Sequence, residues 1–103
     1  MIMVLKKMIV VTAKMKVKPE FMNQFMVEAE TLIKLTRCED GCLSYNLYSD
    51  TANSDDMIML EFWEDMECLD SHMESEHFIA FGKAIPTCMD AEIDISKYEV
   101  QTV

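Results

Sequence analysis

Hydrophobic and polar residues alternate along several stretches of the chain, and each such stretch predicts a β-strand with one buried face. The first covers residues 8–18, whose apolar side comprises Ile9, Val11, Ala13, Met15 and Val17. Residues 42–49 and 57–64 alternate again, and the polar turn formers between them predict a hairpin. A last strand is predicted for residues 91–102, which carry on one face Ala91, Ile93 and Ile95.

A helical spacing of apolar residues separates the first strand from the hairpin and returns after it. Residues 20–37 predict an amphipathic helix whose apolar positions are Phe21, Phe25, Ala29, Leu32 and Thr36. Pro19 suits the first turn of that helix, and the Asp-Gly pair at 40–41 ends it. Two short helices are predicted after the hairpin, at about 66–74 and 76–85. Asp65 and Ser75 are their expected N-caps, and Pro86 ends the helical run.

The order of these elements is β-α-β-β-α-β, with the two short helices together in the second helical position. This order predicts an α+β domain of the split βαβ or ferredoxin-like type, in which an antiparallel sheet carries its helices on one face. The chain has no linker, repeat or low-complexity segment, so residues 1–103 are expected to form one domain with a core from about 8 to 99.

The charge distribution excludes several classes of partner. The chain has 19 acidic and 9 basic residues and a net charge of −10. The segment between Cys38 and Gly82 contains acidic residues and no Lys or Arg. Nucleic acids and anionic membranes require clustered cations, so neither is an expected partner.

Cysteine spacing and hydropathy indicate a reduced, cytoplasmic protein. The four cysteines lack the paired spacing of a zinc site and are expected to be ordinary free thiols: Cys38, Cys42, Cys68 and Cys88. No apolar run approaches the roughly 20 residues that span a bilayer. The first residues have two lysines inside their apolar run and no small-residue cleavage site, so a signal peptide is not expected.

The stretch from Leu60 to Phe81 concentrates the candidate chemistry, because it holds the single tryptophan and both histidines. Trp63 lies on the predicted strand, whereas His72 and His77 lie on the two short helices. An aromatic side chain and a proton-transfer group therefore come from neighbouring elements, as a small pocket for an aromatic substrate requires. His77, at the start of the second short helix, is expected to be exposed to solvent.

Several short motifs carry a resemblance to a known family: ED-G-C-L-x-Y at Glu39–Tyr45, E-x-W-E-D at Glu61–Asp65, Ser71-His72 and His77-Phe78. With the order of elements, they make residues 8 to 99 resemble the antibiotic biosynthesis monooxygenase domain family. The resemblance implies a dimeric α+β barrel with one small pocket per subunit between sheet and helices. Members include cofactor-independent oxygenases of anthrones or quinols, haem-degrading oxygenases and a sugar-phosphate isomerase, so the family fixes fold better than reaction.

The haem-degrading branch does not match this sequence. Its members resemble a pattern with a pocket Asn on the first strand, a Trp on the first short helix and an iron-binding His about ten residues later. Here the first strand has no Asn, the position of the helical Trp is His72, and ten residues further is Gly82. Without an imidazole at the axial-ligand position, haem cleavage is not expected.

What the resemblance implies instead is a homodimeric monooxygenase that needs no cofactor or metal. It would oxidise a small quinol-like or enolisable aromatic compound with dioxygen. His72 is the expected base, which would take a phenolic or enolic proton and leave an anion that reacts directly with dioxygen. The expected substrate contacts are Trp63, Tyr45 and Glu61, with apolar lining from Phe78, Phe81 and Met57.

Each of these residues also has a structural alternative. Trp63 and Tyr45 suit a core equally well, and Glu61, on the same strand face as Trp63, suits a buried hydrogen-bond acceptor. A sugar-phosphate isomerase remains an alternative function, with candidate phosphate-binding cations at Lys14, Lys16, Lys34 and Arg37. A non-catalytic dimeric module that binds a small apolar metabolite is the other alternative, and the 11 methionines would suit its adaptable pocket.

Overall fold

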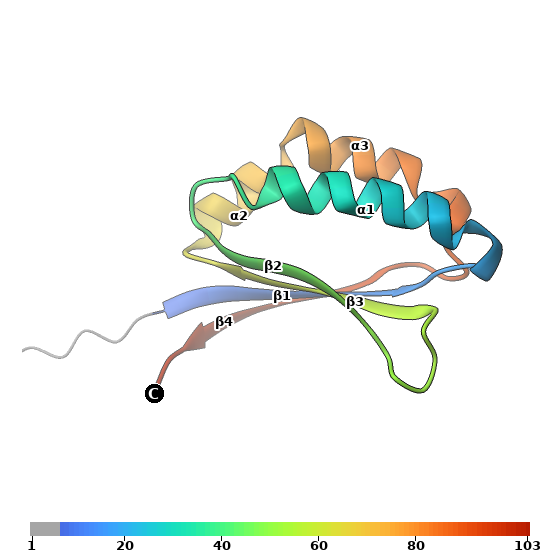
Figure 1. Ribbon diagram of the computed structural model, residues 1–103. Helices are drawn as coiled ribbons and strands as arrows, with labels where there is room; N and C mark the ends of the chain where they lie inside the picture. The colour runs from blue at the N-terminus through green and yellow to red at the C-terminus, as the bar shows by residue number, and fades with distance from the viewer. Residues whose placement is uncertain (1–6) are drawn as a thin grey trace, which may run out of the picture.

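The computed structural model describes residues 7–103 and shows a four-stranded antiparallel sheet with all its helices on one face (Figure 1). The strands are β1 (Lys7–Lys16), β2 (Cys42–Ser49), β3 (Asp56–Trp63) and β4 (Asp94–Gln101). The helices are α1 (Met22–Thr36), α2 (Met66–Met73) and α3 (Glu76–Ala84), with short 3-10 turns at Pro19–Phe21 and Pro86–Cys88. The strand order is β2-β3-β1-β4, which confirms the ferredoxin-like α+β prediction.

Most predicted elements are confirmed to within a few residues. The hairpin of β2 and β3 forms as expected, and the side chains of Asp65 and Ser75 cap α2 and α3 by accepting hydrogen bonds from backbone N–H groups. The last strand is shorter than predicted and begins at Asp94. The first strand also ends early, at Lys16, and Val17 forms only an isolated bridge with Met89. Residues 1–6 of the predicted domain lie outside the described part of the chain.

The core lies between the helices and the inner face of the sheet. Helix α1 contributes the buried stripe that its spacing predicted, Phe25, Ala29, Leu32 and Thr36. Phe25 meets Phe81 edge to face, with ring centroids 6.1 Å apart, and this contact packs α1 against α3. Helix α2 buries Leu69 and His72 and α3 buries Phe81, so these two helices share the covered face of the sheet with α1.

The connection from α1 to β2 depends on Gly41. Its φ of 77° lies in the left-handed region that favours glycine. A Cβ at this position would also collide with the Sγ of Cys68 on α2. This tight turn holds the loop after α1, which carries Glu39, close to α2.

No helix in residues 7–103 has both the length and the apolar character needed to cross a membrane.

Candidate active site

A cavity of about 410 Å³ lies between the inner face of the sheet and helices α2 and α3. Its walls are almost entirely aliphatic, aromatic or methionine side chains from β1, β3, β4 and the helices. The polar side chains that reach it are Tyr45, Glu61, His72 and Lys97. This combination of an apolar enclosure and a few convergent polar groups is typical of a site for a small organic molecule.

His72 lies at the polar end of the cavity and is only 1% exposed. Buried Leu69 and His72 are three residues apart on α2, so the capped helix directs both toward the sheet. Its ring packs against Trp63, Phe78 and Tyr45, at centroid distances of 4.8, 4.9 and 5.3 Å. The imidazole is therefore held on several sides.

The hydrogen bonds of His72 assign different roles to its two nitrogens. Nδ1 lies 2.6 Å from Oε2 of Glu39, and an ionised carboxylate can only accept, so we place the proton on Nδ1. Nε2 then carries a lone pair and lies 3.4 Å from the Tyr45 hydroxyl. Burial lowers the pKa of His72, and this effect outweighs the opposing effect of Glu39. The lowered pKa favours the neutral ring. A neutral imidazole oriented by a carboxylate is suited to general-base chemistry.

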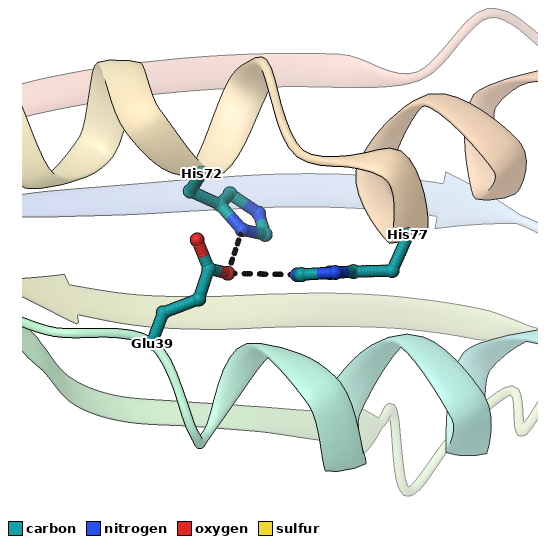
Figure 2. Close-up of side chains that lie close together, drawn as sticks. All are labelled: Glu39, His72 and His77. Atoms are coloured by element: carbon teal, nitrogen blue, oxygen red, sulfur yellow. Dashed lines mark hydrogen bonds and ion pairs between the residues drawn. The ribbon is translucent and has the colours of Figure 1, made fainter.

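Glu39 binds a second imidazole. Nε2 of His77 lies 2.9 Å from the same Oε2, so the two histidines converge on one carboxylate oxygen (Figure 2). The prediction that His77 is exposed was wrong: its side chain is 17% exposed. It turns inward because the Ser75 cap begins α3 immediately after α2 ends, and the first turn of α3 faces the loop that carries Glu39.

No sequence pattern predicted a role for Glu39, which lies 33 residues before His72 inside a strongly acidic segment. One signal was available. Glu39 follows the C-terminus of α1, and its backbone N–H bonds the carbonyl of Thr36 there. A carboxylate is electrostatically unfavourable at that end of a helix, so its presence indicates a partner elsewhere.

Glu61 is the second acidic group of the site, and it is 5% exposed. Its Oε1 accepts a hydrogen bond of 3.0 Å from Nε1 of Trp63. Burial raises the pKa of Glu61 to about 7; the Trp63 bond opposes this shift, Glu39 adds to it and Lys97 reduces it. The carboxyl group therefore changes charge near neutral pH, unlike an ordinary glutamate.

The expected site residues do not all reach the cavity. Tyr45, Glu61, His72, Phe78 and Phe81 line it together.

Trp63 and Met57 occupy other places. Trp63 is fully buried behind Glu61 and His72, so it supports the wall rather than forming it. Met57 contributes to shallower hollows near the start of β3, and Met59, one inward-facing position further along the strand, takes its place in the cavity.

The cations expected for a phosphate site also lie elsewhere. Lys14 and Lys16 border a separate hollow, and Lys34 and Arg37 border a third one beside α1. Arg37 donates to the backbone carbonyl of Tyr45 and to the side chain of Asn46. Within the described residues, the basic side chain that lines the cavity is Lys97 on β4, which was not among the predicted site residues.

The four cysteines are free, as predicted. Burial, assisted by Glu39 and Glu61, raises the pKa of Cys42 to about 11, so its thiol stays protonated at neutral pH.

Comparisons with known proteins agree on the family. Residues 8–84 match the family described as antibiotic biosynthesis monooxygenase. The Bacillus subtilis protein named "Putative monooxygenase YcnE" is 33% identical over 93 residues, which cover 90% of this chain and 98% of that protein. A conserved protein of Methanosarcina mazei Go1 has a crystal structure similar to this fold, with a TM-score of 0.88, 38% identity and coverage of 90% and 92% of the two chains. The structure of Rv0793 from Mycobacterium tuberculosis, 22% identical, shares the fold at a TM-score of 0.83, with 88% and 92% covered.

Proposed function

The chain belongs to the antibiotic biosynthesis monooxygenase family, and from this premise we propose that it is a cofactor-independent monooxygenase of a small quinol-like or enolisable aromatic compound. One observation carries the proposal: Glu39 orients a buried, neutral His72 whose Nε2 faces an apolar cavity. An enclosure of about 410 Å³ suits a compact ring system. Dioxygen, which is itself apolar, enters such an enclosure more readily than an ionic co-substrate.

In the proposed reaction, Nε2 of His72 removes a phenolic or enolic proton from the substrate, and the negative charge of Glu39 stabilises the resulting imidazolium. The substrate anion adds to dioxygen at a carbon that still carries one hydrogen, and the imidazolium returns its proton to the new peroxide to give a hydroperoxide. Loss of water from the hydroperoxide leaves a carbonyl, so one oxygen atom enters the product and the other leaves as water. Two substrate hydrogens supply that water, and no external reductant is needed.

The remaining polar groups suit substrate positioning. The Tyr45 hydroxyl lies beside the base, and burial raises the pKa of this phenol, so it stays protonated and can donate to a substrate oxygen. Phe78 and Phe81 supply aromatic wall for a planar ring. Trp63 fixes Glu61 and the His72 ring from behind.

We also propose that two copies of the chain form the active protein. The described helices all lie on one face of the sheet, and the opposite face carries half-buried Val10 beside Phe62 and Tyr98 in the strand register. Tyr98 and Tyr48 are 52% and 51% exposed. An apolar outer face of this kind is suited to cover by a second sheet. Sedimentation at micromolar concentration should give twice the 11.9 kDa chain mass; a single chain mass would contradict the dimer.

Oxygen uptake with a panel of dihydroxy-aromatics and anthrones tests the function. We expect the wild type to take up oxygen and to form one carbonyl per dioxygen consumed. We expect His72→Ala to lose this oxygen uptake. Tight binding of the same compounds with no chemical change under oxygen would show a binding module instead. Turnover that is unchanged in His72→Ala would remove the base from the mechanism.

A further inference from the structure

The proposed reaction uses only one of the two imidazoles that meet at Glu39. A histidine–carboxylate pair needs no second histidine, yet Nε2 of His77 lies 2.9 Å from the oxygen that binds His72. The three donor atoms, Nδ1 of His72, Nε2 of His77 and Oε2 of Glu39, all lie within 4.8 Å of one another. Two imidazoles and one carboxylate form a common ligand set for zinc and related divalent metals.

From this geometry, we propose that Glu39, His72 and His77 form a binding site for a divalent transition-metal cation of the zinc class, and that a bound cation prevents His72 from acting as a base. The first half of the proposal stands on the donor set alone. The second half rests on the proposed function.

The distances require only small side-chain movements. A zinc ion binds each nitrogen or oxygen at about 2.0–2.2 Å, so its ligand atoms must lie somewhat further apart than the hydrogen-bonded distances of 2.6 and 2.9 Å seen here. Glu39 lies on the loop between α1 and β2, whereas the histidines lie on α2 and α3, so the carboxylate is the ligand with the most freedom to adjust. Figure 2 shows the three side chains converging from these separate elements.

The surroundings favour a cation and provide a route to the site. A surface hollow next to α2 is bordered by Glu39 together with Asp40 and Glu67, so negative charge leads from solvent to the carboxylate that both histidines bind. The side chains of Glu39 and His77 are each 17% exposed. The net charge of −10 would repel an anion from the same position.

A cation on His72 changes the group that faces the cavity. When Nδ1 binds a metal, the single proton of the neutral ring must lie on Nε2, and likewise the proton of His77 moves to its Nδ1. Nε2 of His72 then donates toward the Tyr45 hydroxyl and has no lone pair to accept a substrate proton. Occupancy of the metal site and base catalysis are therefore mutually exclusive.

Cobalt titration of the chelator-treated full chain tests the site directly, because tetrahedral or five-coordinate Co²⁺ has a visible absorption band that does not depend on turnover. One equivalent per chain and displacement by Zn²⁺ are expected. Glu39→Gln and His77→Gln should each weaken binding by at least about tenfold. Glu67→Gln, the same chemical change in the adjacent hollow, removes a nearby charge but no ligand and should weaken binding by less than about twofold. Cys68→Ser, which removes the thiol beside it, should leave binding unchanged. Circular dichroism of every variant establishes that it is folded.

Absence of the band, or equal binding by wild type, Glu39→Gln and His77→Gln, would overturn the metal site. Binding lost in Cys68→Ser but retained in His77→Gln would also overturn it, since a thiol would then be the ligand.

The effect of the cation on the base is tested separately. The ratio of turnover with and without Zn²⁺ is compared in wild type and His77→Gln. Inhibition in the wild type that is relieved in the variant supports the proposal, and activation by Zn²⁺ contradicts it. If no substrate turns over, the cobalt result still decides the site.

Discussion

The two sides of the His72 ring lie in contrasting surroundings. Nε2 faces a cavity with apolar walls and the Tyr45 hydroxyl, whereas Nδ1 faces a polar cluster in which Glu39 also binds His77. The cavity side is built from strands whose apolar residues alternate in sequence and from helices whose apolar residues recur at helical spacing. The cluster side is built from Glu39 on a loop and from His72 and His77, which lie 33 and 38 residues after it in the chain. The difference indicates that substrate contact and control of the base are located on opposite sides of one ring.

The strongest contrast should come from removing the ring itself. We expect His72→Ala to lower kcat by about two to four orders of magnitude, the range typical of a lost general base. His77→Ala should cause a much smaller loss, because His77 binds Glu39 and does not reach the cavity. Oxygen uptake under matched conditions measures both, and equal losses would contradict the division between the two sides.

Replacing Glu61 tests whether the cavity side holds a titrating carboxyl group. The pKa of Glu61 is raised from 4.5 to about 7, so between these values the folded protein keeps a proton that the unfolded chain releases. The stabilisation this gives is complete below about pH 4.5 and is lost as pH rises through about 7.

Glu61→Gln removes this titration and keeps an oxygen for Trp63. Relative to Glu61→Gln, the wild type should lose about 2–3 kcal/mol of unfolding free energy between about pH 5 and pH 8. Urea unfolding of both proteins across this range measures the difference. A constant difference would show that Glu61 titrates normally.

Glu39→Gln should make His72 a weaker base without changing the residues that line the cavity. The amide keeps the size of the side chain but removes the charge that stabilises imidazolium, so kcat should fall by about 10- to 100-fold while KM changes little. Steady-state kinetics separate the two constants. Glu67→Gln is the matched control, and a rise in KM alone would assign Glu39 to substrate binding.

The smallest effect is expected for Tyr45→Phe. The contact between its hydroxyl and His72 is long, at 3.4 Å, so its loss should change the free energy of unfolding by about 1 kcal/mol or less. The edge-to-face packing of Tyr45 on Trp63 is kept by phenylalanine. Thermal unfolding measures the change, and a much larger loss would mean that the hydroxyl has a stronger structural role than this geometry shows.

The fold was largely predictable because its determinants are local. Period-two alternation located β2 and β3, and the Asp65 and Ser75 caps located the starts of α2 and α3. Parity along β3 correctly placed Glu61 and Trp63 on one buried face. Strand ends were less accurate: β4 begins later than its alternation suggested, because pairing with β1 begins only at Asp94.

The site was only partly predictable. The choice of His72, Tyr45 and Glu61 came from their positions on short periodic elements and from the family resemblance, and the structure brings all three to one cavity. Met57 was predicted to line the cavity but lies beside it, because alternation along a strand identifies the face of a residue and not how far along the strand the cavity extends. His77 was misjudged because its partner, Glu39, lies 38 residues away in sequence.

By itself, the sequence determined the order of the elements, their buried faces and the family, since each depends on the spacing of neighbouring residues or on short motifs. Tertiary structure alone decided that Glu39 is shared by His72 and His77, that Trp63 stands behind the cavity wall, and that Lys97 is the cation beside it. The physical reason is that hydrogen bonds and burial depend on distances in space. Those distances are set by how α1, α2 and α3 pack on the sheet, and local patterns do not encode them.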